Sequence, residues 1–419
     1  WIIMSLTGAV PFLLTGEIPG IADALFESVS GFTTTGATVV PDVEKLSRCV
    51  LFWRSLMHWI GGMGVLVFML AILPLKGGNT VHLLRAESSG PSVSKIMPKV
   101  QTSASILYLI YIGLTALEAV LLKLGGMTLF DSLNYAMSTA ATGGFGVYNE
   151  GIGVYNSDFI NIVVTVFMFL FGLNFNVYFL LYMRRPKDAL HCEEMHWYLG
   201  IIVAAALMIC ANAYDVAMTL EGNLRQSFFQ VASIITTTGF ATTDFNLWPG
   251  FSHGILVVLM FVGACAGSTG GGFKVSRIVI GFKSVLAYLG AFLHPRVVRK
   301  VKFEDKDVDG ETMRAISAYF TAAISLFTIS VLLVALDGFD LVTTFSAVAA
   351  TFNNVGPGLG VAGPTSNFAA FSDFSKVVMT MDMLFGRLEV FPMLMLFYPP
   401  LWKESIGEAR IRRNRSPFH

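Results

Sequence analysis

The string "TTTGAT" occupies residues 33–38 and directly follows the apolar segment "ADALFESVSGF" at 22–32. A similar string, "TTTGFAT", occupies residues 236–242 and also follows an apolar segment. One such string is usually a turn beside a helix. Its return in the same setting indicates an internal repeat, and a repeat of this length decides the fold of a chain.

The composition indicates a membrane protein. Of the 419 residues, 54% are hydrophobic and 13% are charged, whereas soluble domains carry about 25% charged residues. Most of the long apolar runs can cross a hydrocarbon core, which needs about 20 helical residues. These runs cover residues 1–14, 50–73, 104–122, 159–183, 197–220, 254–280, 314–336 and 375–398. The sequence therefore predicts an all-α polytopic membrane protein.

Other bulk features exclude some classes of function. The formal net charge is zero, so no overall field favours nucleic acid. The four cysteines are scattered without CxxC spacing, which predicts neither a disulfide framework nor a zinc site. Trp1 is not an initiator residue and the apolar run begins at once. We therefore expect the chain to begin inside its first helix, with upstream residues absent.

Shorter apolar segments, each followed by a threonine-, asparagine- or glycine-rich string, lie between the members of each pair of runs. They are too short to span a membrane and too apolar for ordinary loops, which is typical of re-entrant half-helices. With their strings, they read "ADALFESVSGFTTTGAT", "FDSLNYAMSTAATGGFG", "RQSFFQVASIITTTGFAT" and "FDLVTTFSAVAATFNNVGPG". The first to fourth strings are residues 33–38, 141–146, 236–242 and 352–358.

Alignment of the strings predicts a fourfold repeat. It places four glycines at one position: Gly36, Gly143, Gly239 and Gly356. The predicted fold is four repeats of helix, pore half-helix, filter loop and helix around a single pseudo-fourfold pore. The predicted boundaries of the four repeats and of a cytoplasmic tail are 1–75, 100–185, 195–295, 311–402 and 403–419. Basic residues follow the second helix of each repeat, so the positive-inside rule places the strings open to the opposite side.

The strings have the properties of a cation filter. Irregular backbone at membrane depth is tolerated where it lines water, and rings of carbonyls can replace the hydration shell of a monovalent cation. Each half-helix also directs its negative C-terminal end toward its string. The predicted filter residues are Thr34, Thr35, Gly36, Ala141, Thr142, Gly143, Thr237, Thr238, Gly239, Asn354, Val355 and Gly356.

A glycine-rich run, residues 263–274, interrupts the second helix of repeat three. Each glycine weakens a helix by about 1 kcal/mol relative to alanine. In a phosphate-binding loop, lysine follows the last glycine directly. Here Phe273 stands between Gly272 and Lys274, so that motif is excluded. The run is either a packing hinge or a loop that obstructs the pore, and we favour the loop. Its candidate gating residues are Gly263, Gly267, Ser268, Thr269, Gly270, Gly271, Gly272 and Lys274.

Arg387 lies inside the last apolar run. A charge at the bilayer centre costs about 2.5–3.5 kcal/mol, so it should face a cavity or a partner. One interpretation is a salt bridge to Asp382 or Glu389. The other, which we favour, places Arg387 beside the pore below the filter, where its charge would oppose a permeating cation.

Six motifs carry a family resemblance over essentially the whole chain. They are "SGFTTTGATV", "GGMGVLVFMLAILP", "HPRVV", "GACAGSTGGGFKVSRI", "ATFNNVGPGLG" and "MLFGRLEVFPMLML". Together they resemble the Trk/Ktr/HKT superfamily of potassium transporters, most nearly its bacterial Trk-type membrane subunit. The resemblance implies one pore per chain, a homodimer, an intramembrane gating loop at the glycine-rich run and an arginine below the filter. It also implies cytosolic nucleotide-binding regulatory (RCK-type) subunits and a multi-pass protein of the bacterial inner membrane.

The resemblance also bears on the transported ion. Family members with serine in the first string tend to admit sodium, so glycine in all four strings implies selection of K⁺ and Rb⁺. The resemblance implies no covalent cofactor. The alternative is a non-selective or Na⁺-coupled cation transporter of the same superfamily. The fourth string departs most, with Asn353, Asn354 and Val355, and the family shows the same departure. The helical pair that often precedes the first repeat in bacterial members is missing, which agrees with the expected truncated start.

Three weaker signals remain open. The motif "HCEEMH" at 191–196 is either a metal site or, as we favour, a solvated helix start on the cytoplasmic side. Glu118 is expected to pair, to snorkel or to lie in a dimer contact. Asn174 and Asn176 interrupt an apolar run and would bond either across the pore or between helices.

Two other functions are disfavoured. A membrane enzyme needs a catalytic cluster in one cavity, and the 7 histidines lie mostly near predicted membrane ends or in loops. We therefore predict that the chain is not an enzyme. A secondary transporter with broken helices usually has inverted repeats, whereas these repeats all run in the same direction.

Overall fold

The computed structural model describes residues 1–64, 100–215, 219–293, 300–396 and 398. Within them the chain is helical apart from one two-stranded hairpin, so the predicted all-α class is confirmed. The part of the predicted run 50–73 beyond residue 64 and the cytoplasmic tail lie outside the described residues.

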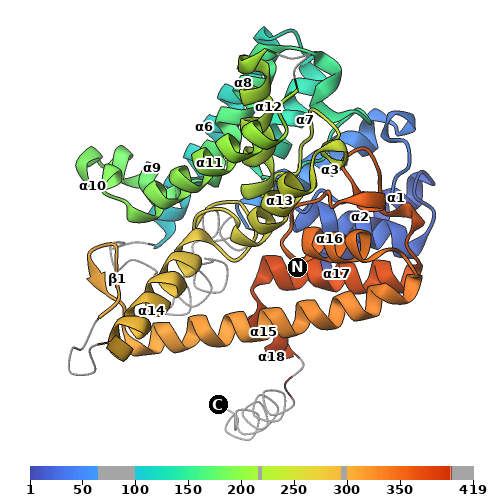
Figure 1. Ribbon diagram of the computed structural model, residues 1–419. Coiled ribbons are helices and arrows are strands. Elements are labelled where there is room, and N and C mark those ends of the chain that lie inside the picture. The colour runs from blue at the N-terminus through green and yellow to red at the C-terminus, as the bar shows by residue number, and fades with distance from the viewer. Residues whose placement is uncertain (65–99, 216–218, 294–299, 397, 399–419) are drawn as a thin grey trace, which may run out of the picture.

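The elements recur in one order. In each group a helix is followed by a half-helix, an irregular string and a second helix (Figure 1, in which the colour runs from blue to red along the chain). The first group contains α1 (Ile2–Thr15), α2 (Ile21–Phe32), η1 (Val43–Lys45) and α3 (Arg48–Gly62). The second contains α6 (Val100–Leu124), α7 (Leu129–Ala140), η2 (Gly151–Tyr155), α8 (Asp158–Gly172), α9 (Phe175–Tyr182) and α10 (Pro186–Leu190).

The other two groups follow the same order. The third contains α11 (Glu193–Asn212), α12 (Leu220–Ile235), η3 (Phe245–Leu247), α13 (Gly250–Val262) and α14 (Val275–Leu293), followed by strands β1 (Lys302–Phe303) and β2 (Lys306–Asp307). The fourth contains α15 (Gly310–Val334), η4 (Ala335–Asp337), α16 (Leu341–Phe352), η5 (Gly360–Ala362), η6 (Phe368–Ala370), α17 (Asp373–Leu388) and α18 (Val390–Leu396).

Three of the four half-helices begin at a side-chain cap. The side chains of Thr128, Thr219 and Asp340 accept hydrogen bonds from backbone N–H groups in the first turns of α7, α12 and α16. Such caps satisfy N–H groups that have no partner inside the helix. Three half-helices therefore start where the sequence supplies a capping threonine or aspartate, whereas α2 starts after Gly20 without a side-chain cap, and each of the four ends at its string.

The half-helices and second helices form a closed ring. The second helix of each group packs against the half-helix of the next: α3 on α7, α8 on α12, α13 on α16, and α17 on α2. The last of these contacts brings the fourth group against the first, and Figure 1 shows red α17 beside blue α2. Because every group touches the next in the same way, the four strings are held around one axis.

Several second helices are interrupted, which corrects the prediction of continuous runs. The predicted run 159–183 is divided into α8 and α9, which meet at 87°. The run 375–398 is broken at Glu389, whose φ is 67°. The run 254–280 is divided by the glycine-rich run, as expected. Polar residues stand at both of the first two breaks, Asn174 and Asn176 at one and Arg387 and Glu389 at the other, but hydropathy alone does not show that the helix breaks there.

Four of the described helices are long and apolar enough to cross a membrane on their own. They are Ala104–Leu124, Glu193–Asn212, Val275–Leu293 and Gly310–Asp337. The bent pair α8–α9 counts as a fifth candidate, and several shorter apolar helices accompany them.

Candidate ion pathway

The four strings share one backbone conformation. Four non-glycine residues have φ between 54° and 59°, a region that such residues rarely adopt: Thr34, Thr142, Thr237 and Asn354. Two positions later, four glycines have φ between 79° and 103°: Gly36, Gly144, Gly239 and Gly356. The residue between them donates its N–H to a carbonyl five residues back in each string, at Ser30, Ser138, Ser233 and Ala350.

This register corrects the predicted alignment by one residue in the second string. Gly144, not Gly143, occupies the position of Gly36 and Gly239. Gly143 instead corresponds to Thr35 and Thr238. The second string contains two adjacent glycines, so pattern alone cannot decide which one takes the left-handed conformation.

The glycines bring the strings into contact in cyclic order. A Cβ atom added to Gly36 would lie 1.9 Å from the carbonyl oxygen of Gly143, and one added to Gly144 would lie 2.1 Å from that of Thr238. The same relation joins Gly239 to Val355 O at 2.1 Å, and Gly356 to Thr35 O at 2.7 Å. Real Cβ atoms do not approach this closely, so only glycine lets the four backbones meet.

An open hollow of about 420 Å³ lies at one end of this ring. Residues from all four strings line it, among them Gly36, Gly144, Gly239 and Gly356. Its wall carries the acidic side chains of Glu150 and Asp244. Since one water molecule takes about 30 Å³ of liquid, the hollow has room for several water molecules beside the ring.

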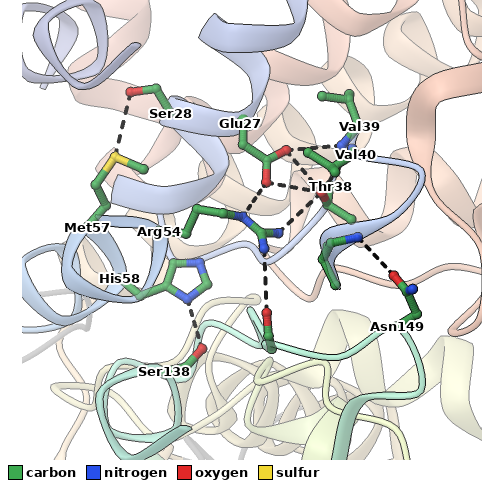
Figure 2. Close-up of polar contacts among 12 residues, drawn as sticks. Glu27, Ser28, Thr38, Val39, Val40, Arg54, Met57, His58, Ser138 and Asn149 are labelled. Carbon is green, nitrogen blue, oxygen red and sulfur yellow. Dashed lines mark hydrogen bonds and ion pairs between the residues drawn. The ribbon is translucent and has the colours of Figure 1, made fainter. Parts of the chain in front are cut away.

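A buried ion pair supports the first string. Glu27 in α2 and Arg54 in α3 are joined by Oε1 and Nε at 2.8 Å, and each is at most 1% exposed (Figure 2). The Glu27 carboxylate also accepts hydrogen bonds from Thr38 Oγ1 at 3.0 Å and from the N–H of Val39 at 3.0 Å. The carboxylate thus binds the segment directly after Gly36, and the guanidinium holds the carboxylate.

The same pair reaches the second string. Arg54 Nη1 lies 3.5 Å from the carbonyl oxygen of Gly146, and its guanidinium lies 4.0 Å from the centre of the Phe145 ring. His58 stacks on Phe145, with ring centres 4.1 Å apart, and its Nδ1 lies 3.1 Å from Ser138 Oγ (Figure 2). Glu27, Arg54 and His58 are not among the residues predicted from the sequence. A signal for Glu27 and Arg54 was present in the sequence, because two opposite charges inside the apolar segments of one repeat are expected to pair.

The glycine-rich run contacts the third and fourth strings directly. The N–H of Gly271 donates to Thr237 Oγ1 at 2.6 Å, and the N–H of Gly272 donates to the carbonyl oxygen of Asn353 at 3.1 Å. A Cβ atom on Gly270 would lie 2.8 Å from Thr236 O, so the approach requires glycine there. The run is therefore a loop seated against the strings, and not a hinge within a continuous helix.

Polar side chains of the run attach it to neighbouring backbone. Thr269 Oγ1 donates to the carbonyl oxygen of Phe171 at 3.2 Å, and Ser268 Oγ donates to that of Cys265 at 2.6 Å. The ammonium group of Lys274 donates to the carbonyl oxygen of Gly270. Thr269 thus holds the run to the end of α8, while the bonds of Ser268 and Lys274 stay within the run.

Arg387 connects the run to repeat one. Its Nη1 donates to the carbonyl oxygen of Thr269 at 2.6 Å, and its Nη2 donates to those of Gly61 and Gly62. The two alternative partners are engaged elsewhere. Glu389 pairs with Arg277 at 2.6 Å, and Asp382 accepts from Ser330 Oγ at 2.6 Å. Arg387 therefore lies beside the run and pairs with neither Asp382 nor Glu389, while its place beside a pore stays a prediction.

The weaker signals resolve differently. Glu194 of "HCEEMH" is 2% exposed and accepts three hydrogen bonds, so the prediction of a solvated helix start is wrong for this residue. Asn174 bonds between helices, to Glu194. Glu118 is fully buried within the chain and does not snorkel. Among the described residues, no group of three His, Cys, Asp or Glu side chains is placed to hold a metal ion.

The chain is similar to known transport proteins. The family model described as "TrkH: Cation transport protein" matches residues 1–404. The Trk system potassium uptake protein TrkH of Salmonella typhimurium is 38% identical over 413 residues, which cover 96% of this chain and 84% of the relative. TrkG of Escherichia coli (strain K12) is 35% identical over 408 residues, with the same two coverages.

A solved structure agrees with these relatives. The crystal structure of the potassium transporter TrkH from Vibrio parahaemolyticus superposes with a TM-score of 0.84 at 35% sequence identity. The similarity covers 96% of this chain and 84% of that one.

Proposed function

The chain belongs to the TrkH family of cation transport proteins, and on this premise we propose that it is the K⁺-translocating membrane subunit of a Trk-type potassium uptake system. It is a multi-pass protein of the bacterial inner membrane and a transporter, not an enzyme. In the proposed mechanism, the four strings select K⁺ and Rb⁺, and the glycine-rich run gates their passage.

The observation that carries the proposal is the cyclic contact of the strings. At the ring, each glycine leaves no room for a side chain, because a Cβ atom would meet the carbonyl oxygen of the next string. The groups available to an ion on the axis are therefore backbone carbonyls, which can replace the hydration shell of K⁺. The C-terminal ends of α2, α7, α12 and α16 add partial negative charge at the same level.

The filter residues follow from the corrected register. We assign the four equivalent triplets to the filter: Thr34–Gly36, Thr142–Gly144, Thr237–Gly239 and Asn354–Gly356. Ala141 then stands one position earlier, with Thr33 and Thr236, and contributes at the inner end. Gly144 thereby joins the residues that we propose for the filter.

The run obstructs the inner end of this path in the proposed mechanism. An ion that leaves the third and fourth strings meets the backbone of Gly270, Gly271 and Gly272, which bonds to those strings. A typical hydrogen bond contributes about 0.5–1.5 kcal/mol net, so release of the run costs a few kcal/mol. Coupling energies between sites are typically about 1–3 kcal/mol, so a bound partner can supply much of this energy.

Arg387 has two roles in this proposal. Its charge opposes a cation that approaches the run. Its hydrogen bonds to Thr269, Gly61 and Gly62 also hold the run against repeat one. Opening therefore requires both that the bonds break and that the charge moves away from the axis.

The partners are also proposals. They are K⁺, membrane lipid, a second copy of the chain in a homodimer, and cytosolic nucleotide-binding RCK-type subunits. The exposed basic residues Arg184, Arg185 and Lys187, which begin the cytoplasmic side of the second group under the proposed orientation, provide a surface for the last of these.

Uptake of radioactive rubidium into liposomes that contain the purified protein tests the function. Uptake above that of empty liposomes, independent of a sodium gradient, supports K⁺ translocation. A strict requirement for a sodium gradient would instead favour the Na⁺-coupled alternative. Absence of flux even when the run is released by substitution would contradict the proposal.

A further inference from the structure

One carboxylate joins the glycine-rich run to the helix that follows it. Glu194 Oε1, in the first turn of α11, accepts the N–H of Ala266 within the run at 2.7 Å and the N–H of Ser276 in α14 (Val275–Leu293) at 3.1 Å. Its Oε2 accepts from Asn174 Nδ2 at 3.2 Å. Glu194 is 2% exposed, and hydrogen bonds to an ionised acceptor are roughly twice as strong as neutral ones. The contact therefore fixes Ala266 relative to the start of α14.

Asn174 stands at the break between α8 and α9. Its Oδ1 caps α9 by accepting the N–H of Asn176 at 2.9 Å. The next residue, Phe175, donates its N–H to the carbonyl oxygen of Gly267 at 3.1 Å. The break in repeat two and the run in repeat three are thus in contact, and Glu194 binds both.

A cytoplasmic hairpin holds the backbone of Glu194. Strands β1 and β2 are joined by Glu304 and Asp305, with φ of 52° and 58°. Glu304 Oε1 accepts from the N–H of Glu194 at 3.1 Å and from Cys192 Sγ at 3.3 Å. The N–H of Glu304 in turn donates to Glu193 Oε2 at 3.2 Å. Figure 1 places β1 beside α14 at the end of the molecule away from α2 and α16.

The turn of this hairpin is unusual. Two positive φ angles define a type I′ turn, which normally takes Asn-Gly or Asp-Gly. Two non-glycine residues in that conformation are strained, and strain persists where surrounding contacts determine it. Here the surrounding contact is the bond of the Glu304 side chain to the start of α11.

We propose that Glu194 is a positioning residue that holds the glycine-rich run against the filter, and that Glu304 of the cytoplasmic hairpin sets the strength of this hold. The contacts form a continuous path from Glu304 through Glu194 to Ala266 and Ser276. The run then reaches Thr237 and Asn353. The inference rests on the proposed function for its consequence in transport, while the hold itself is a property of the structure.

A donor–acceptor exchange tests the role of Glu194. Glu194→Gln places its amide against that of Asn174, and Asn174→Asp places two carboxylates together. The double variant restores one donor opposite one acceptor, and the new aspartate still caps α9. The measurement is hydrogen exchange of residues 264–276, with rubidium flux as the second readout. Glu311→Gln, a change of an exposed acid at the start of α15, is the matched control.

The expected result is that the two single variants loosen the run and that the double variant restores it. Each single variant should raise exchange at Ala266 and Ser276 by about tenfold and should raise flux. Glu194→Gln turns the charge-assisted bonds to these N–H groups into neutral ones, and Asn174→Asp sets a second carboxylate against Glu194. The double variant should return toward the unsubstituted protein. Unchanged exchange in both single variants would overturn the inference, as would a double variant no better than either. Altered exchange without flux in any variant would count against the proposed function, while the inference that Glu194 positions the run would still stand.

The hairpin has its own matched pair of substitutions. Glu304→Gly relieves the turn and deletes the contact to Glu194, whereas Asp305→Gly relieves the turn and keeps the contact. We expect faster exchange at Ala266 and Ser276 only for Glu304→Gly. Equal exchange in the two variants would overturn the part assigned to the hairpin.

Discussion

The hydroxyl oxygen of Thr237 accepts the backbone N–H of Gly271 at 2.6 Å, which joins the third string to the glycine-rich run. Thr237 has a φ of 59°, a conformation that β-branched residues seldom adopt. Asn354, the equivalent residue of the fourth string, instead donates to Thr35 Oγ1 and to the carbonyl oxygen of Met383. One backbone position therefore serves the contact with the run in one repeat and the contact between strings in another.

Thr237→Val should weaken the contact between the third string and the run, because valine keeps the shape of threonine and loses the oxygen that accepts the N–H of Gly271. We expect a several-fold rise in rubidium flux, from the loss of a bond of about 1 kcal/mol. Thr34→Val makes the same change in the first string, for which the structure gives no contact to the run. Equal flux in the two variants would show that the effect comes from the filter and not from the run.

Arg387→Ala should raise rubidium flux about tenfold or more, because it removes both a positive charge and several charge-assisted hydrogen bonds. Arg387→Lys separates the two roles. It keeps the charge but has no planar fork to reach Thr269 and Gly62 together. Flux near that of the alanine variant would assign the effect to the bonds, and flux near the unsubstituted protein would assign it to the charge. A lower flux in the alanine variant at normal expression would contradict both.

Gly36→Ser should reduce discrimination between K⁺ and Na⁺. A Cβ atom would lie 1.9 Å from the carbonyl oxygen of Gly143, and the φ of 80° is strained for serine, so the two strings must move apart. We expect at least about a tenfold loss in the ratio of K⁺ to Na⁺ competition, which corresponds to about 1.4 kcal/mol. Gly113→Ser, at a site in α6 with open space around it, is the control and should keep the ratio.

Arg54→Met should lower the free energy of unfolding by about 3–5 kcal/mol, because it leaves the buried Glu27 carboxylate without its cation. Thermal unfolding in detergent measures this change. Lys45→Ala removes an exposed ion pair with Asp42, and such pairs contribute about 0–1 kcal/mol. Similar unfolding temperatures for the two variants would mean that the buried pair does not support the first string.

The sequence was sufficient for the fold class and for the main groups of the pathway. Hydropathy predicted the all-α class, and the recurring strings predicted where the backbones meet. Gly270 and Arg387 lie far apart in the sequence, yet each was expected near the filter. The structure places Gly270 against Thr236 of the third string and Arg387 against Thr269 of the run. These features were predictable because a cluster of glycines weakens a helix and a charge inside a membrane is costly.

Other features depend on contacts that no local pattern encodes. Two adjacent glycines made Gly143 and Gly144 indistinguishable until their φ angles were known. Asn174 and Asn176 interrupt an apolar run, but the sequence does not show that Asn174 caps a new helix at a sharp bend. Glu194 was predicted to be solvated because helix starts on the cytoplasmic side are usually exposed to solvent. Its partners Ala266 and Ser276 are far away in sequence, so only the folded chain shows why it is buried.

The central claim is that four backbone strings select K⁺. Competition against radioactive rubidium uptake, with purified protein in liposomes and K⁺, Na⁺ or Cs⁺ outside, tests it most directly. The carbonyl ring predicts strong competition by K⁺ and little by Na⁺ in the unsubstituted protein and in the Gly113→Ser control. Equal competition by Na⁺ and K⁺ would contradict it.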